Sequence, residues 1–314
     1  MYILKEFEFW TSEISSIVEK TMYGKDILIT NVQPLGQIRK NSMAVCYPKY
    51  KNELKKIKHN CLIFCDDDSI IENEYITYII SENPRFTFFK FLSEFLVEET
   101  SYWHSEVISV ISQNYPDVKF GYNVRIGKNV VIAPHNSIGS NCIIGNNVVI
   151  RSKVKIGSNC LIKDNSVIGS EGFGFIKSGN EIIHIPQIGN ILIGDNVTIG
   201  SNCTIERPGL GCTIIHDNVK IDDLVQIGHN QEIGEGTMIA TGFKAEGGLI
   251  IGRGCFIGMG VTIVDASIGN HCIIGAGAII SKPISDYTVA YNKIELIQKD
   301  DKNKIDNLFK TPLK

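Results

Sequence analysis

Several absences narrow the possible classes of this 314-residue chain. No run of 18 apolar residues is present, so the sequence predicts no membrane-spanning helix. A net charge of -3 gives no electrostatic argument for binding nucleic acid. No signal peptide precedes the nine cysteines, and their odd number argues against a disulfide framework. We therefore expect a soluble protein of the reducing cytoplasm.

The cysteines also lack the spacing of a metal site. Zinc sites in proteins use paired ligands such as C-x2-C, and the only close pair here is Cys61 and Cys65, inside an apolar run. The sequence predicts no metal and no bound cofactor.

The chain does contain an aliphatic residue at every sixth position over long stretches. The first stretch comprises Ile126, Ile132, Ile138, Ile144, Ile150, Ile156, Ile162 and Ile168. A period of six fits neither an α-helix nor a hairpin meander, but it fits a coil with three short flat sides and one inward aliphatic residue per side. The pattern therefore predicts a mainly β fold, a parallel solenoid.

Two interruptions divide this repeat. They cover residues 170–186 and 207–213. Between them the period resumes with Ile193, Ile199 and Ile205. After the second interruption it runs from Ile215 to Ile263, with Ala245 at one inward position, and Ile268, Ile274 and Ile280 follow one residue out of phase. Five cysteines stand two residues before an inward aliphatic residue, where a coil needs a small side chain: Cys142, Cys160, Cys203, Cys255 and Cys272. We expect these thiols to be buried as small apolar groups.

Residues 1–113 lack the period of six and are predicted to form a small α/β domain. Strands are expected at residues 27–32, 60–64 and 76–80, and a helix is expected from the spacing of Phe86, Phe89, Leu92 and Leu96. The solenoid is assigned to residues 114–284 and a C-terminal tail to residues 285–314.

A basic cluster lies in this first domain. It comprises Lys49, Lys51, Lys55, Lys56 and Lys58, beside Tyr47 and Tyr50. One interpretation is a solvated helix face; the other is an anchor for phosphates, with the aromatic rings available to stack on a base.

His229 is the best candidate for catalysis in the solenoid. It stands two residues after inward Ile227 and should project outward from a corner. One coil is 18 residues long, so Gly247 should stack on His229 at about 5 Å. A histidine beside free backbone amides suits acyl transfer to an amine, because the reaction needs a base and an oxyanion donor. Glu246 could orient the imidazole or act as an alternative base. The competing interpretation is a histidine that only decorates the surface.

Three motifs in order extend this hypothesis. They are Gly169–Phe175, His184–Gly189 and Ile221–Asn230, and together they resemble the UDP-3-O-(3-hydroxyacyl)glucosamine N-acyltransferases of lipid A biosynthesis. Pro48–Tyr50 and Asn83–Arg85 are similar to the nucleotide-binding domain of that family. The resemblance implies a homotrimeric left-handed β-helix that transfers an acyl group from a thioester to a nucleotide-sugar amine, with His229 as the general base.

The substrate contacts expected from these motifs fall in both domains. They are Tyr47, Lys49, Tyr50, Phe173, Phe175, Gln187, Asn230 and Lys244. Gly247 is the expected oxyanion donor. The acyl donor would be acyl-CoA or acyl-carrier protein, used as a co-substrate.

The chain departs from the family pattern at several positions. Ala44 and Tyr47 replace a phenylalanine and an asparagine at the uridine site, Glu206–Gly209 replaces D-R-G-A, and a second histidine is missing near Asp265. We therefore expect a changed substrate: another nucleotide-linked amino sugar, for example a dTDP-4-amino-4,6-dideoxyhexose, N-acylated from an acyl-CoA. An enzyme of the dTDP-anthrose pathway, which would use a short 3-hydroxyacyl-CoA, is one candidate. The lipid A enzyme itself is the alternative, and a non-catalytic hexapeptide scaffold is a third possibility.

Overall fold

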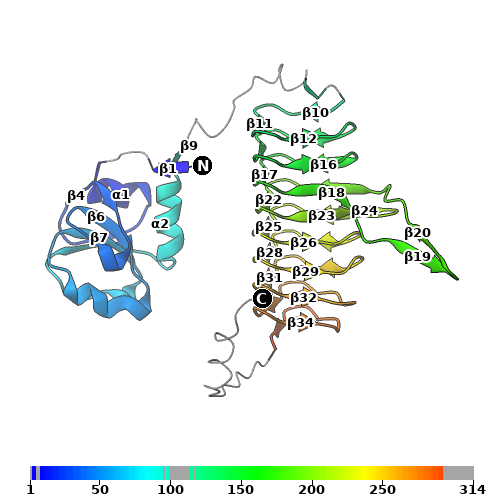
Figure 1. Cartoon of the computed structure of the whole chain (residues 1–314). Coiled ribbons are helices and arrows are strands. Elements are labelled where there is room, and N and C mark those ends of the chain that lie inside the picture. Colours follow the sequence, from blue (N-terminus) through cyan, green and yellow to red (C-terminus); the bar gives the residue numbers. More distant parts are fainter. Residues whose placement is uncertain (1, 5–7, 95, 99–113, 116, 293–314) are drawn as a thin grey trace, which may run out of the picture. The chain divides into compact units, whose positions relative to one another are not determined.

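The computed structural model describes residues 2–4, 8–94, 96–98, 114–115 and 117–292 (Figure 1). The chain divides into two compact units, Met1–Tyr102 and Trp103–Lys314, which we treat separately. The predicted boundary after residue 113 falls outside the described residues. Within the described residues, no helix combines the length and the apolar character needed to cross a membrane.

Unit 1 is built on a five-stranded sheet with the order β3-β8-β7-β6-β5. Four of these strands run parallel, and β3 is antiparallel to its neighbour. The bounds are β3 (Met22–Tyr23), β5 (Asn31–Val32), β6 (Ser42–Val45), β7 (Cys61–Cys65) and β8 (Ile76–Ile80). Two antiparallel pairs accompany it: β1 (Tyr2–Leu4) with β9 (Leu96–Glu98), and β2 (Phe9–Trp10) with β4 (Leu28–Ile29).

Five helices complete the described part of this unit. They are α1 (Thr11–Ile17), α2 (Pro84–Ser93) and the 3-10 helices η1 (Leu35–Gln37), η2 (Pro48–Lys56) and η3 (Asp67–Ser69). Phe88 and Phe91 bury α2 against the sheet, and the Phe88 ring lies edge-on to Phe64 at 5.2 Å.

Three sequence predictions for this unit were wrong. The strand expected at residues 27–32 splits into β4 and β5, which belong to different sheets. The helix ends at Ser93, and Leu96 lies in a strand. The apolar face was misplaced as well, because Phe86 and Phe89 are exposed while Phe88 and Phe91 are buried. The strand at β6 was missed, because four residues are too short to show an alternating pattern.

Unit 2 is the predicted parallel solenoid, with three flat faces (Figure 1). The first face contains β10 (Lys119–Phe120), β13 (Ser137–Ile138), β16 (Val154–Ile156), β21 (Asn190–Ile193), β24 (Cys212–Ile215), β27 (Glu232–Ile233) and β30 (Ile250–Ile251). The second contains β11 (Arg125–Ile126), β14 (Ile143–Ile144), β17 (Leu161–Ile162), β22 (Thr198–Ile199), β25 (Lys220–Ile221), β28 (Met238–Ile239), β31 (Phe256–Ile257), β33 (Ile273–Ile274) and β35 (Val289–Ala290). The third contains β12 (Val131–Ile132), β15 (Val149–Ile150), β18 (Val167–Glu171), β23 (Thr204–Arg207), β26 (Gln226–Ile227), β29 (Lys244–Ala245), β32 (Thr262–Ile263) and β34 (Ile279–Ile280).

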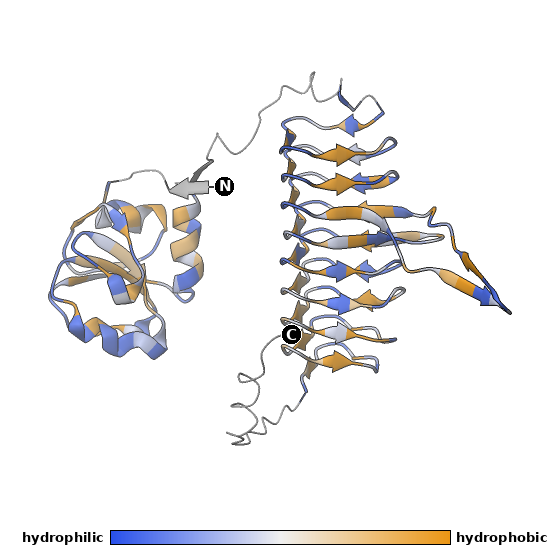
Figure 2. Ribbon diagram, in the orientation of Figure 1, coloured by the Kyte–Doolittle hydropathy of each residue, from blue (hydrophilic) through white to orange (hydrophobic). Residues whose placement is uncertain are grey.

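The inward aliphatic residues form one continuous core. Ile126, Ile144 and Ile162 lie in register on consecutive coils, and every predicted inward residue is buried. The five cysteines at the small positions are buried and free, as predicted. Figure 2 shows hydrophobic residues along the stacked strands.

The corners rely on residues that tolerate the left-handed backbone conformation. Asn123, Asn129, Asn141 and Asn147 all have φ between 53° and 59°, and asparagine is among the few non-glycine residues that adopt this region readily. Neighbouring corner asparagines also bond to each other, as in the 3.0 Å bond from Asn123 to Asn141. The six-residue repeat therefore depends on an asparagine at the corner as well as on an aliphatic residue in the core.

The solenoid continues past residue 284, where the sequence prediction placed its end. Strand β35 pairs in parallel with β33, so residues 289–290 still belong to a coil. The first predicted interruption forms a hairpin of β19 (Phe175–Ser178) and β20 (Glu181–His184), which projects from the stack after β18 (Figure 1).

Candidate active site

One corner of the solenoid carries most of the residues singled out in the sequence. It is the corner where the chain passes from the third face to the first face. The hairpin insertion follows β18 at this corner, the second interruption follows β23, and His229 follows β26. The two interruptions and the histidine therefore come together on three consecutive coils.

The imidazole of His229 lies between two glycines. A Cβ atom added at Gly247, in the next coil, would be 2.3 Å from Cε1 of His229, and one added at Gly172 would be 2.7 Å from its Cδ2. Gly247 was predicted to stack on His229, and the geometry confirms it. Gly172 comes from the insertion. Any larger side chain at either position would displace the ring.

Asn230 fixes one side of the imidazole. Its Oδ1 lies 3.2 Å from Nδ1 of His229. The asparagine is itself held, because its Nδ2 donates to the Leu210 carbonyl at 2.9 Å and its backbone N–H donates to the Thr213 hydroxyl at 2.9 Å. Glu246 is exposed, and no hydrogen bond joins it to His229 although the structure describes both residues. Orientation of the ring therefore comes from Asn230 rather than from Glu246.

The strand ladder is broken beside this histidine. Gln231 is 1% exposed, and its Nε2 donates to the backbone carbonyls of Ala245 at 3.2 Å and Glu246 at 2.7 Å. At the corresponding position three coils earlier, after β15, Arg151 N–H donates to the Ile168 carbonyl of the next coil, as a regular ladder requires. Among the described residues, neither Gly228 N–H nor Gly247 N–H has a hydrogen-bond acceptor. Two backbone donors beside the imidazole are thus unengaged.

A pocket of about 620 Å³ opens next to His229. Its lining residues come from the two interruptions, from the two residues that follow the first interruption, and from the histidine corner: Phe173, Gly174, Phe175, Ile185, Pro186, Gln187, Ile188, Gly209, Leu210, His229 and Asn230. Four predicted substrate contacts, Phe173, Phe175, Gln187 and Asn230, are therefore brought together with the histidine. Lys244 is exposed on β29 and lies outside this lining.

The hairpin that forms one wall contacts the end of β18, from which it emerges. His184 packs its ring 5.0 Å from that of Phe175, and its Nε2 lies 3.7 Å from the Glu171 carboxylate. Gln187 is buried, and its Nε2 donates to the Ile185 carbonyl at 2.9 Å. The two strands of the hairpin also expose apolar side chains. Ile176 is 52% exposed to solvent and Ile182 is 64% exposed.

Comparison with known proteins identifies the family. Residues 137–170 match a model of the bacterial transferase hexapeptide, and residues 118–152, 190–222 and 248–282 match one of the hexapeptide repeat of succinyl-transferase. A UDP-3-O-acylglucosamine N-acyltransferase of Coxiella burnetii is 33% identical over 247 residues, covering 73% of this chain and 72% of that protein. The chain belongs to the UDP-3-O-acylglucosamine N-acyltransferase family.

Other members of the family match a shorter segment. The enzyme of that name from Janthinobacterium sp. is 40% identical over 119 residues, covering 38% of this chain and 34% of its own length. Among solved structures, a UDP-N-acetylglucosamine acyltransferase from Campylobacter jejuni is 20% identical, with a TM-score of 0.42 over 62% of this chain and 81% of that chain.

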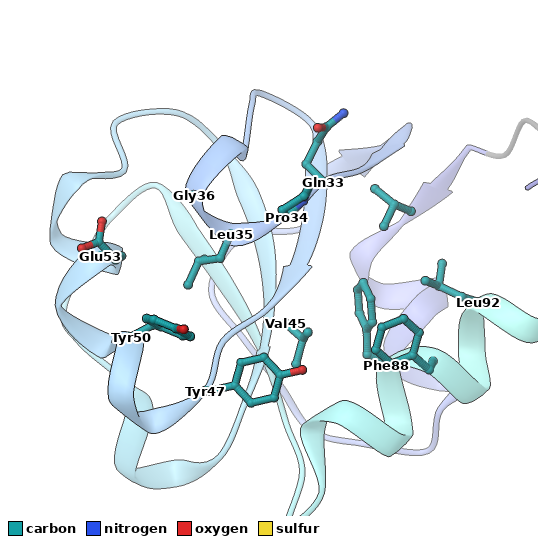
Figure 3. A pocket seen from close by; sticks show the side chains of 12 residues that line it. Gln33, Pro34, Leu35, Gly36, Val45, Tyr47, Tyr50, Glu53, Phe88 and Leu92 are labelled. Carbon is teal, nitrogen blue, oxygen red and sulfur yellow. The ribbon is translucent and has the colours of Figure 1, made fainter. Parts of the chain in front are cut away.

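The remaining predicted contacts, Tyr47, Lys49 and Tyr50, lie in unit 1, which has a pocket of its own. Tyr47 and Tyr50 line it, with their ring centroids 6.4 Å apart and the rings at 72° (Figure 3). Lys49 does not line it, and its Nζ lies 4.8 Å from the centroid of the Tyr50 ring. Two other lysines of the basic cluster are occupied, since Lys51 donates to the Asp68 carbonyl and Lys56 pairs with Glu53 at 2.8 Å.

Several site residues were missed in the sequence. Gly172 and Leu210 lie in the interruptions, whose path no period predicts. Gln231 could have been recognised from the sequence, because it places a polar amide at a position where the coil needs a small or apolar side chain. Ala44, a departure from the family pattern, is 1% exposed and does not line the unit 1 pocket.

Proposed function

We propose that this protein transfers an acyl group from a thioester to the amine of a nucleotide-linked amino sugar. The observation that carries the proposal is the seating of His229 between Gly172 and Gly247 at the wall of the pocket. A partly exposed imidazole held by Asn230, beside unengaged amides, suits proton transfer coupled to oxyanion formation.

The reaction is direct, without a covalent enzyme intermediate. His229 accepts a proton from the attacking amine, the nitrogen forms a bond to the thioester carbonyl carbon, and the carbonyl oxygen becomes the oxyanion. Backbone N–H groups of Gly228 and Gly247 stabilise that oxyanion. The C–S bond then breaks, and His229 returns the proton to the leaving thiolate. The products are an amide and a free thiol.

The acceptor we favour is a UDP-3-O-acylglucosamine. The names of the relatives support it. The half-buried ring of Tyr47 or the exposed ring of Tyr50 would stack on the base, with Lys49 beside them.

A second acceptor follows from the substitution at Tyr47. Its ring lines the unit 1 pocket at a position where the family resemblance implies an asparagine. This change favours a different nucleotide sugar, a dTDP-4-amino-4,6-dideoxyhexose, acylated by a short 3-hydroxyacyl-CoA. Acyl-CoA and acyl-carrier protein are both candidate donors.

The proposed active assembly is a homotrimer. The β19–β20 hairpin exposes Ile176 and Ile182 while its base forms a wall of the pocket, and a two-stranded hairpin is rarely stable when uncovered. Packing against a second copy would cover the hairpin and close the pocket from the open side.

The function is tested by incubating the protein with a panel of acyl-CoA and acyl-carrier-protein donors and with UDP- and dTDP-linked amino sugars. Thiol release is followed together with the mass of the amide product. Turnover with UDP-3-O-acylglucosamine supports the favoured acceptor, and turnover only with the dTDP sugar supports the second. Absence of amide formation from every pair would reject N-acyltransfer.

A further inference from the structure

Exposed basic side chains gather beside the solenoid pocket, at the corner between the third and first faces that follows β15. Arg151 and Lys153 lie on this corner, and Lys155 projects outward from β16 between buried Val154 and Ile156. We call Arg151, Lys153 and Lys155 the basic corner. Within the described part of the chain, no ion pair joins any of the three to a carboxylate. Their positive charges therefore remain available to an anion.

Lys153 connects the basic corner with the wall of the pocket. Its Nζ donates a 3.1 Å hydrogen bond to the carbonyl of Ile188, and Ile188 lines the pocket. A lysine ammonium has three N–H donors, so two of them remain for a ligand. The backbone of Lys153 has a φ of 63°, a conformation that is uncommon for lysine and that asparagine adopts more readily. The ammonium of Lys153 is thus held at the rim of the pocket.

Arg207 adds a further positive charge behind this corner. Its Nη1 lies 3.4 Å from both the carbonyl and the hydroxyl oxygen of Ser152, and its Nη2 lies 3.3 Å from the Gly169 carbonyl oxygen. Its Nε is buried and has no hydrogen-bond partner. Every group that contacts this guanidinium is uncharged. A partly buried cation without a counter-ion is unfavourable, so a nearby anion would stabilise it.

The two carboxylates that lie beside Arg207 in the sequence and in the strand register are engaged with other groups. Glu171 pairs with Arg207 in the ladder of β18 and β23, but its side chain faces His184 at 3.7 Å. Glu206 accepts a 2.9 Å hydrogen bond from Gln226. Neither forms an ion pair with Arg207, although the structure describes all of these residues. Positive charge therefore exceeds negative charge on this side of the pocket.

The pocket leads from His229 toward the basic corner. Three coils separate the two corners, a distance of about 14 Å along the solenoid. Two residues that line the pocket, Leu210 and Ile188, lie on the coils between them. In a nucleotide-linked sugar the diphosphate is bonded to the sugar ring itself. A sugar whose amine reaches His229 therefore carries its phosphates along this pocket.

We propose that the basic corner, together with Arg207, binds the diphosphate of the nucleotide-sugar acceptor. The inference rests on the proposed function and adds a subsite to it. The cations recognise the phosphate oxygens by charge-assisted hydrogen bonds, which do not depend on the base that the nucleotide carries. The same subsite therefore serves a UDP-linked and a dTDP-linked sugar.

Binding can be measured on the full-length protein without turnover. UDP-N-acetylglucosamine and dTDP-glucose, which have no free amine, are titrated calorimetrically, with inorganic pyrophosphate as a competitor. Arg151→Gln and Lys153→Asn should each weaken both nucleotide sugars about tenfold, because each removes a charge-assisted contact, and should leave the binding of uridine unchanged. Lys128→Gln is the matched control, since it removes an equal charge from an exposed lysine on another corner.

Two results of the titration would overturn the inference. One is wild-type affinity for both nucleotide sugars in Arg151→Gln and in Lys153→Asn. The other is a loss of pyrophosphate competition in Lys49→Gln but not in Lys153→Asn, which would place the diphosphate on unit 1.

Kinetics distinguish failure of this inference from failure of the proposed function. Lys153→Asn should raise the KM for the acceptor about tenfold with little change in kcat, because the contact with the diphosphate is the same in the ground state and the transition state. Acyl transfer with an unchanged KM would reject the subsite and leave the proposed function standing. Weakened binding of UDP-N-acetylglucosamine in Lys153→Asn, in a protein that forms no amide from any substrate pair, would support the subsite and reject the function.

Discussion

The side-chain amide of Gln231 donates a 2.7 Å hydrogen bond to the backbone carbonyl of Glu246, one coil further along the solenoid. The same amide also occupies the Ala245 carbonyl, with which Gly228 N–H would pair in an unbroken ladder. Gln231 therefore occupies the acceptor that the Gly228 N–H would use in a regular coil.

Gln231→Val should lower the activity of the protein without lowering its stability. Valine lets Gly228 N–H pair with the Ala245 carbonyl, which removes one oxyanion donor, and we expect kcat to fall by up to about 10²-fold with little change in KM. The Oε1 atom of Gln231 is buried without a partner, so the melting temperature should stay level or rise. Steady-state kinetics and thermal melts check both. Unchanged kcat would mean that Gly228 N–H takes no part in the reaction.

His229→Asn should abolish most turnover. Removing a general base costs about 10²- to 10⁴-fold in kcat, measured by thiol release with the acceptor found in the substrate panel. His216→Gln is the matched control, because His216 is an exposed histidine paired with Glu232 at 2.8 Å, away from the pocket. Near-normal turnover in His229→Asn would place the base elsewhere, with Glu246 the next residue to substitute.

Gly247→Ala and Gly172→Ala should displace the imidazole without unfolding the coil. The added methyl groups would lie 2.3 Å and 2.7 Å from ring atoms of His229, and the ring can rotate away. Misplacement of a catalytic group by about 1 Å can cost on the order of 10²-fold in rate. Gly36→Ala, which meets no neighbour, is the control. Wild-type kinetics in both solenoid variants would show that the observed ring position is not the reactive one.

Ile182→Asp should weaken the proposed trimer. Ile182 is 64% exposed on the hairpin, and a buried unpaired carboxylate at an interface is strongly unfavourable. Light scattering coupled to size-exclusion chromatography should show loss of the trimer. Lys177→Glu, on the same hairpin, changes charge without removing an apolar contact and serves as control. A stable trimer in Ile182→Asp would exclude the hairpin tip from the interface.

Asp26 should make unit 1 sensitive to acid. The Ser12 backbone N–H, followed by the hydroxyls of Ser12 and Thr11, lowers the pKa of Asp26 below its ordinary value of 3.8. A carboxylate with a lowered pKa stabilises the fold above about pH 4, and this contribution is lost as the pH falls through the lowered value. Asp26→Asn should therefore melt earlier at pH 7, with the difference from wild type shrinking below about pH 4. Glu74→Gln is the control. A loss of melting temperature in Asp26→Asn that is as large below about pH 4 as at pH 7 would contradict the assignment.

The sequence by itself determined the solenoid and the position of its histidine. An aliphatic residue at every sixth position is compatible with few folds. Because each coil has 18 residues, the sequence numbers alone predict that Gly247 stacks on His229. The interruptions could be located in the same way, because they are where the counting fails. In unit 1, short strands and a helix with phenylalanines on two faces gave no such periodic constraint, and two elements were misjudged.

Only the tertiary structure decided what surrounds the histidine. The path of an insertion depends on contacts that have no period, so the wall formed by Phe173, Ile185 and Leu210 could not be read from spacing. The same holds for the unit 1 pocket, which joins residues from β5, η1, β6, η2 and α2. Counting gives register along a regular coil, whereas a pocket is made where separate segments converge, and that convergence is a property of the packed chain.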